Sequence, residues 1–482
     1  VLGYEQRKYT NSSIAASRYD LPENNLLDQI NAGDASDQRN DGGMDENSIR
    51  SVFGRINYNF AERYLLEVTL RYDGSSRFPK NNRFELFPSV SAGWRISEED
   101  FFNFDPISNL KLRASWGHLG NQEIGNYAYQ NKYSLGRLYG FGNIMYSGIA
   151  ENYSMSNSTI GWENTEMVNA GLDLNILNNR LSFTFDYFVR NTRDILMSLP
   201  QPTILGAYAP VINAGAVRNK GFEMQLGWND QLKDFNYYAN LSVSRVKDKI
   251  TDLKGADTPG RSVGDPINNI FGLEAIGLFA SEEEIKNAPN QDYTGGASPG
   301  DIRYKDQNGD KKITAEDRVN LGNTFPGVTF GLQLGASYKG FDIATTIHAV
   351  ADVQGYLTGT AAQAFANGAS ALEAQKDRWT PNNLNASYPR LSLNNASRNY
   401  TQTNSFFMEN ASYIKMRNLQ IGYSLPKSIL SNLFVEKFRF YVNADNLFTI
   451  TSFRGFDPET PWGGGNIYPM VTSYTFGLNL VF

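Results

Sequence analysis

The final ten residues are Ser473-Tyr474-Thr475-Phe476-Gly477-Leu478-Asn479-Leu480-Val481-Phe482, and this stretch decides the fold class. Aromatic or aliphatic side chains occupy every second position from Tyr474 to Phe482, and the positions between them are mostly small or polar. Alternation with a period of two predicts a β-strand with one apolar face and one polar face.

The same alternation recurs along the chain. It predicts fourteen strands, near residues 1–12, 50–60, 63–74, 84–97, 109–118, 166–177, 180–196, 217–229, 235–248, 328–339, 341–354, 411–425, 437–450 and 472–482. A soluble β-sandwich explains any one of them, but its strands usually have about 5–6 residues. A tilted membrane strand needs about 9–11. Long strands whose polar face carries charged residues such as Glu67, Asp186 and Arg190 favour an antiparallel transmembrane β-barrel.

The predicted connections sort by length. Those at 61–62, 178–179, 230–234 and 340 are short, and those at 13–49, 119–165, 197–216, 249–327, 355–410 and 451–471 are long. Apart from the medium pair 75–83 and 98–108, every second connection is clearly short. Bacterial barrels have short periplasmic turns and longer external loops, whereas a sandwich has no reason for this order. We therefore predict a bacterial outer membrane location, with the last strand ending on the short-turn side.

Composition excludes several other classes. The 482 residues contain no cysteine, so thiolate metal sites and cysteine nucleophiles are ruled out. Two histidines make a histidine-rich metal site improbable. A net charge of −6 argues against nucleic-acid binding. The sequence contains no apolar run of about 18 residues, so no transmembrane helix is predicted. Aromatic residues make up 13% of the chain, a content that is typical of an outer-membrane β-barrel.

Several short motifs stand out in the sequence. They occur in order along the chain and comprise Arg71-Tyr72-Asp73-Gly74-Ser75-Ser76-Arg77-Phe78, Phe87-Pro88-Ser89, Gly93-Trp94-Arg95, Leu112-Arg113-Ala114-Ser115-Trp116-Gly117, Gly120-Asn121-Gln122-Glu123-Ile124-Gly125, Asn219-Lys220-Gly221-Phe222-Glu223, Arg378-Trp379-Thr380-Pro381, Tyr388-Pro389-Arg390-Leu391, Ala411-Ser412-Tyr413-Ile414-Lys415, Asn446-Leu447-Phe448-Thr449 and Tyr474-Thr475-Phe476-Gly477-Leu478. Together these motifs resemble those of the SusC/RagA family of TonB-dependent outer-membrane transporters, and the set is far more specific than any single motif.

The resemblance implies a barrel of about twenty-two strands with a plug inside it, energised through TonB. It also implies a SusD-like surface lipoprotein as partner and import of a nutrient such as an oligosaccharide or a peptide. Residues 1–482 match the C-terminal part of such a barrel, so the plug, the TonB-contacting segment and roughly eight strands are expected to precede Val1. The alternatives are a passive pore of fourteen strands, which is geometrically allowed, and a barrel-type enzyme.

A candidate calcium loop lies within the connection 249–327. Asp306, Asn308 and Asp310 stand at positions 1, 3 and 5, the Lys312 carbonyl at position 7, and Asp317 at position 12. The run resembles dockerin-like loops, although the glycine expected at position 6 is replaced by lysine. The alternative is a solvated surface turn in which Asp and Asn side chains bond to their own backbone.

No catalytic site is predicted. His118 and His348 lack a nucleophile or paired acid in sequence, so we expect packing roles and no enzymatic activity. Aromatic residues in the long connections are candidate contacts to substrate or partner, and those singled out are Trp379, Trp462, Tyr139 and Tyr146. Terminal Phe482, preceded by alternating apolar residues, resembles the signal that barrel-assembly machinery recognises.

Overall fold

Fourteen long strands form one antiparallel sheet, which we call the wall. The computed structural model describes residues 1–23, 28–151, 154–199, 202–258, 260–393, 398–430, 435–464, 467–468 and 470–482. The wall strands, in spatial order, are β1 (Leu2–Arg18), β2 (Gln38–Phe60), β3 (Tyr64–Ser75), β4 (Phe84–Arg95), β5 (Ile107–Asn121), β8 (Glu163–Ile176), β9 (Leu181–Arg193), β12 (Ala216–Leu232), β13 (Phe235–Asp252), β18 (Val328–Tyr338), β19 (Phe341–Ala351), β22 (Tyr413–Ser424), β23 (Lys437–Thr451) and β25 (Ser473–Val481). All fourteen predicted strands are confirmed.

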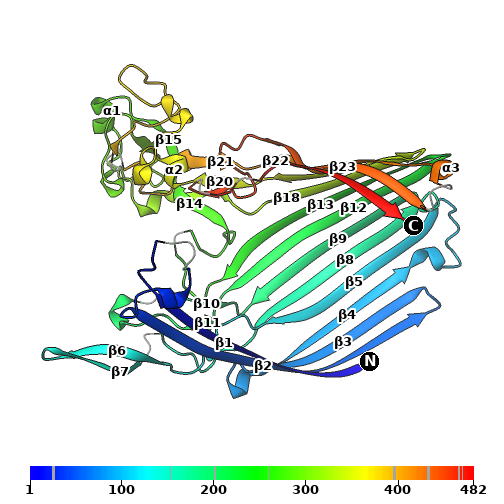
Figure 1. Cartoon of the computed structure of the whole chain (residues 1–482), viewed down its shortest axis with the longest axis horizontal. Coiled ribbons are helices and arrows are strands. Elements are labelled where there is room, and N and C mark those ends of the chain that lie inside the picture. Colours follow the sequence, from blue (N-terminus) through cyan, green and yellow to red (C-terminus); the bar gives the residue numbers. More distant parts are fainter. Residues whose placement is uncertain are drawn as a thin grey trace.

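Each wall strand pairs with its neighbours in chain order, and the sheet curves around a hollow (Figure 1). Within the described residues the ladder ends at β1 on one side and at β25 on the other, so the wall is open. Both chain termini lie at the end where the connections are short (Figure 1). An open wall of fourteen strands agrees with part of a larger barrel and not with a fourteen-stranded pore that closes on itself.

The predicted connection at 13–49 is wrong over much of its length. β1 and β2 pair without interruption from Leu2 opposite Gly54 to Arg18 opposite Gln38, so both strands run well past the predicted ends at residues 12 and 50. These extensions are polar or exposed on both faces. A strand pair that projects into water has no apolar side to bury, and the alternation that identifies membrane strands is lost there.

In the described part of the chain, the remaining strands and all but the last of the α-helices belong to the long connections. The strands among them are β6 (Tyr133–Phe141), β7 (Ile144–Glu151), β10 (Leu196–Ser198), β11 (Val211–Asn213), β14 (Asn269–Leu273), β15 (Ala275–Leu278), β16 (Ile302–Tyr304), β17 (Arg318–Asn323), β20 (Gln354–Leu357), β21 (Met408–Asn410) and β24 (Trp462–Gly463). The helices are α1 (Glu282–Asn287), α2 (Gly359–Ala362) and α3 (Lys427–Leu430). No helix in the described part of the chain is long and apolar enough to cross a membrane.

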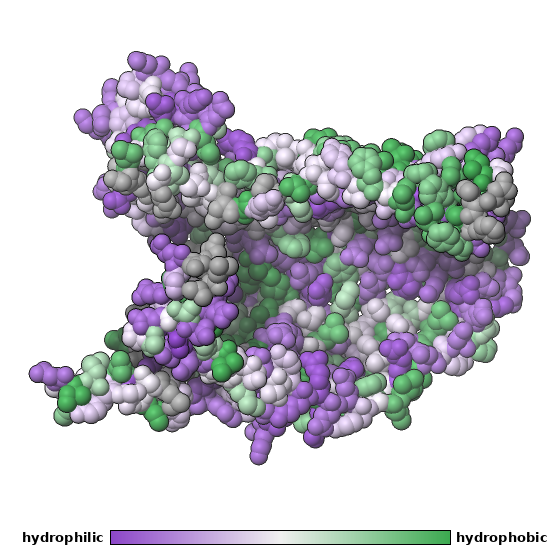
Figure 2. All heavy atoms as spheres, viewed as in Figure 1, coloured by the Kyte–Doolittle hydropathy of each residue, from purple (hydrophilic) through white to green (hydrophobic). Residues whose placement is uncertain are grey.

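The largest buried core lies outside the wall. Residues 268–323 and the described residues of 354–410 fold together into a unit that we call the loop lobe, which projects beyond the long-loop end of the wall (Figure 1). Its core residues are Ile270, Leu273, Ile302, Tyr304, Ile313, Tyr356, Ala362, Tyr388 and Phe407. Figure 2 shows hydrophilic residues gathered over the outside of this lobe. Two connections that are distant in sequence therefore form one folded body.

Candidate functional site

The inner face of the wall is polar because it carries the polar half of each alternating strand. On β3 the apolar side chains Leu66, Val68 and Leu70 share one face with Tyr64 and Tyr72, while the other face carries mainly polar and charged residues. Register aligns those inner residues across five strands, and the resulting row comprises Asn57, Glu67, Ser91, Ser115 and Asn169. This row of oxygen and amide groups runs across the hollow side of the wall.

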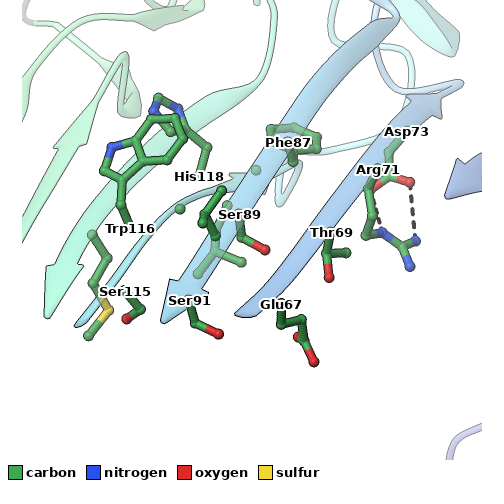
Figure 3. A pocket seen from close by; sticks show the side chains of 15 residues that line it. Glu67, Thr69, Arg71, Asp73, Phe87, Ser89, Ser91, Ser115, Trp116 and His118 are labelled. Carbon is green, nitrogen blue, oxygen red and sulfur yellow. Dashed lines mark hydrogen bonds and ion pairs between the residues drawn. The ribbon is translucent and has the colours of Figure 1, made fainter. Parts of the chain in front are cut away.

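A hollow of about 390 Å³ lies over β3, β4 and β5 (Figure 3). Glu67, Thr69 and Arg71 line it from β3, and Ser89 and Ser91 line it from β4. In Figure 3 the Arg71 guanidinium is joined to the neighbouring Asp73 carboxylate, at 3.2 Å from Nε and 3.1 Å from Nη2. Part of the motif Arg71–Phe78 thus supplies an ion pair among the residues that line this hollow.

Further along the wall, one guanidinium joins two carboxylates. Arg113 on β5 donates to Asp173 on β8 (2.8 Å from Nε) and to Asp186 on β9 (2.9 Å from Nη2). Gly171 leaves the space that this arrangement needs, because a Cβ there would lie 2.5 Å from Asp186 Oδ1. Bidentate pairs of this kind fix side-chain geometry. The triad presents one excess negative charge to the hollow.

A buried ionic cluster fastens the last long connection to the wall. Lys415 on β22 is 2% exposed, and its Nζ lies 3.3 Å from Glu459 and 3.6 Å from Asp457. Arg417 pairs with the same Glu459 carboxylate. Sequence analysis assigned no role to Lys415. Its acidic partners lie in a connection more than forty residues further on, and no pattern in the sequence near Lys415 predicts the contact.

The candidate calcium loop is a surface turn on the loop lobe. Asp306 accepts hydrogen bonds from the backbone N–H groups of Gly309 (2.7 Å) and Lys311 (2.9 Å). Asn308 and Asp310 each accept from the N–H two residues further on, at 3.0 and 2.8 Å. These are the self-bonded contacts of the surface-turn alternative.

The backbone of this loop nevertheless has features that calcium loops use. Lys311 adopts φ 63°, the left-handed conformation for which such loops normally place glycine at position 6. Asp317 is fully buried and accepts from the N–H groups of Gln307 (2.8 Å) and Thr314 (2.7 Å). Among the described residues, however, no three carboxylate or histidine groups converge closely enough to hold a metal ion. Binding would therefore require these carboxylates to turn inward.

The four candidate aromatic residues do not form one site. Trp379 packs inside the loop lobe, where a Cβ at Gly300 would lie 2.5 Å from its ring. Trp462 is 52% exposed and stacks on Tyr356 with ring centroids 5.1 Å apart. Tyr139 and Tyr146 are directly opposite each other in the β6–β7 hairpin. The structure thus brings together only this last pair.

The two histidines lie in different surroundings. The His118 ring packs edge-on against Trp116 and contacts the Asn164 side chain at 3.0 Å. The His348 ring contacts the Tyr413 hydroxyl at 3.1 Å. Neither of these recorded partners is a nucleophile poised beside a catalytic base. The expected packing roles match these contacts.

Comparison with known proteins identifies the family. Residues 2–447 match the family model described as TonB dependent receptor-like, beta-barrel. The chain is 29% identical to TonB-dependent receptor P3 of Formosa agariphila, over all of this chain and 50% of that protein. It is 30% identical to TonB-dependent receptor SusC of Bacteroides thetaiotaomicron, over 90% of this chain and 44% of that protein.

Solved structures agree. The structure of the RagAB peptide transporter aligns with a TM-score of 0.83 and 26% identity, over 99% of this chain and 52% of that one. The wall is therefore the barrel wall of an outer-membrane receptor. The chain belongs to the TonB-dependent receptor-like β-barrel family, as its SusC/RagA-like motifs predicted, and the family places it in the bacterial outer membrane. It spans about half the length of the relatives it matches.

Proposed function

We propose that this chain forms part of the passage wall of an active importer for a hydrophilic nutrient, an oligosaccharide or a peptide. The observation that carries the proposal is the polar inner row from Asn57 to Asn169, together with the charged groups beside it. Hydroxyl, amide and carboxylate groups exchange hydrogen bonds with a hydrated cargo and offer little to an apolar one. Transport needs no bond chemistry, so this proposal requires no catalytic residue in the wall.

The energy for import is proposed to come from TonB, acting on a plug domain of the kind that the family resemblance implies. The experiment compares a deletion strain, the restored strain and a strain lacking TonB, each grown on single oligosaccharides or peptides. An importer predicts that one class of nutrient fails to support growth both without this protein and without TonB. Uptake that needs the protein but not TonB would indicate a passive pore instead.

A variant of the inner row refines this test. Glu67 borders two adjoining hollows of the wall, of about 390 and 500 Å³. Glu67→Arg reverses a charge in the passage without altering the apolar face, so uptake of the identified cargo should fall while protein levels stay normal. Glu62→Arg, in the short turn between β2 and β3, is the matched control. If the Glu67 and Glu62 variants take up the cargo equally well, this part of the wall does not line the passage.

For a SusD-like surface lipoprotein, we propose that the β6–β7 hairpin is a contact surface. It projects from the long-loop end of the molecule (Figure 1), and one of its faces carries Tyr139, Phe141, Ile144 and Tyr146, each between 54% and 72% exposed. An exposed apolar patch of this kind commonly marks a protein interaction site. Aromatic residues such as these are enriched at interfaces.

The test is co-purification of the lipoprotein with the receptor. Tyr139→Ser combined with Tyr146→Ser should reduce recovery of the partner by at least about tenfold, the effect expected when two interface anchors are lost. Ile14→Ser with Met44→Ser is the control, since Ile14 (91%) and Met44 (69%) are equally accessible on the projecting β1–β2 pair. Unchanged recovery with the tyrosine variants would place the partner elsewhere.

We also propose that calcium binds the Asp306–Asp317 loop and stabilises the lobe without taking part in transport. The oxygen-rich donor set and the left-handed Lys311 support this role. Calcium should raise the melting temperature of the lobe, and Asp306→Asn with Asp310→Asn should abolish that increase. If the wild-type lobe has the same melting temperature with calcium and with a chelator, the loop is a surface turn that bonds to its own backbone and binds no calcium.

A further inference from the structure

A patch of positive charge lies on the outer face of β12 and β13. The residues of β12 that face outward are Phe222, Met224, Leu226 and Trp228, followed towards the long-loop end by Lys220 and Arg218. On β13 the outward residues Leu241 and Val243 are followed by Arg245, Lys247 and Lys249. We call Arg218, Lys220, Arg245, Lys247 and Lys249 the outer basic patch. All five are exposed.

Strand register places these cations against one another. Lys220 is directly opposite Lys247, and Arg218 is directly opposite Lys249. Side chains directly opposite in an antiparallel pair have Cβ atoms about 4.5–5.5 Å apart, and like charges in such pairs destabilise the sheet. Two consecutive like-charged pairs therefore destabilise the sheet locally, and bound anions would offset this electrostatic repulsion.

The protein itself provides little compensation. Arg218 donates to the neutral side chain of Asn191 at 2.7 Å. On the neighbouring strand β9, Arg193 lies 3.7 Å from Glu166, so that pair largely neutralises itself. Across the described chain, no ion pair includes Lys220, Arg245, Lys247 or Lys249. Four cations thus remain available to an external anion.

The depth of the patch indicates which anion it meets. From Phe235 to Val243 the outward side of β13 is aromatic or aliphatic over roughly the length, ~9–11 residues, that a tilted strand needs to cross hydrocarbon. The cations begin at the next outward position. On the strands that follow, the outward residues near the same end are apolar, as at Val328, Ala351 and Ile414. On the side of β18, β19 and β22, the row of outward cations therefore ends at β13.

We propose that the outer basic patch binds the phosphate groups of a phosphorylated glycolipid of the outer leaflet. In bacterial barrels the longer connections are extracellular, so the patch, which lies towards the long-loop end of β12 and β13, is on the external side. Cations beside phosphate form strong charge-assisted hydrogen bonds. The apolar surface directly below the patch would meet the acyl chains of the same molecule. Free phosphate would gain only the first of these contacts, which is why the site fits a lipid.

The experiment is native mass spectrometry of the detergent-purified protein with added bis-phosphorylated lipid A. We expect one tightly held lipid on the wild type. Lys220→Gln, Lys247→Gln and Lys249→Gln combined should weaken binding by about a hundredfold, the effect expected for three cations at a headgroup layer. The corresponding triple change to arginine retains charge and should retain binding, which separates loss of charge from loss of folding.

The control removes three exposed lysines elsewhere, with Lys254→Gln, Lys286→Gln and Lys376→Gln, and should bind as the wild type does. Dephosphorylated lipid A should bind weakly, and millimolar inorganic phosphate should not displace the intact lipid. The proposal is overturned if the glutamine triple keeps its lipid, if the control triple loses it equally, if dephosphorylated lipid binds as well, or if inorganic phosphate competes.

Discussion

Lys415 Nζ lies 3.3 Å from Glu459 Oε1, and this contact joins strand β22 of the wall to the long connection that precedes the final strand. The lysine is 2% exposed, so its charge depends on Glu459 and Asp457 for compensation. A cation that deep is tolerated only when acidic groups and hydrogen bonds surround it. The contact therefore positions the last connection against the wall.

Removing the two acidic partners should release that connection. Asp457→Asn with Glu459→Gln leaves Lys415 buried without a counter-charge, which typically costs about 3–5 kcal/mol. Hydrogen exchange should show faster exchange across residues 453–463 while β9 and β12 remain protected. Lys437→Met, at an exposed position of β23, is a control that should change neither region. Unaltered exchange in the acidic double variant would show that the ion cluster does not hold the connection.

The loop lobe should unfold separately from the wall. Leu273 is fully buried in the lobe core, and Leu273→Ala should cost about 2–5 kcal/mol of lobe stability. Leu232→Ala, at a residue that is 61% exposed, should cost little. Limited proteolysis should cleave the Leu273 variant within residues 268–323 and 354–410 and leave the wall strands resistant. If the protease digests the lobe and the wall of this variant at the same rate, the lobe is not a separate folding unit.

Low pH should weaken one turn of the lobe. The Asn383 amide, at 2.9 Å, and the Ser387 N–H, at 3.0 Å, bond to the Asp377 carboxylate and hold its pKa below the ordinary value. A lowered pKa means that ionised Asp377 favours the folded lobe at neutral pH, and that this contribution fades as the pH falls below about 4. The difference in melting temperature between wild type and Asp377→Ala should therefore shrink at acid pH. A constant difference would contradict this assignment.

The final strand should be required for assembly. β25 pairs with β23 from Ser473 opposite Asp445 to Val481 opposite Lys437, and its deletion leaves the β23 edge unpaired. Unpaired backbone groups are not tolerated in hydrocarbon, so removal of residues 473–482 should abolish membrane insertion. Thr475→Ser and Asn479→Gln, on the inner face, should insert normally. Normal surface levels of the truncated protein would count against the barrel assignment.

The sequence predicted the parts of the fold that the membrane dictates. Tyr474, Phe476 and Leu478 repeat at every second residue because one face of β25 meets lipid, and all fourteen wall strands carry enough of this signal to be found. The projecting part of β2 was missed, because Gln38 and its neighbours meet water on both faces.

The candidate site was less predictable. Contacts such as Lys415 with Glu459, or Arg113 with Asp186, depend on strand register and loop folding and have no fixed spacing in sequence. Trp379 was predicted as a candidate contact to substrate or partner. In the structure its ring packs in the lobe against Gly300, because the lobe core is formed by connections that sequence analysis treats as separate. The outer basic patch likewise emerges only when β12 and β13 are aligned.

The central claim is that one face of the wall meets lipid and the other meets water. Residues 1–482 contain no cysteine, so single spin labels can be placed in them with Phe222→Cys, Met224→Cys and Leu226→Cys, or with Glu223→Cys and Gln225→Cys. In bilayers, accessibility to oxygen and to a water-soluble nickel complex should alternate with a period of two, oxygen dominating at the first three positions and nickel at the other two. Equal accessibility on both faces, or burial of both from lipid, would contradict the account.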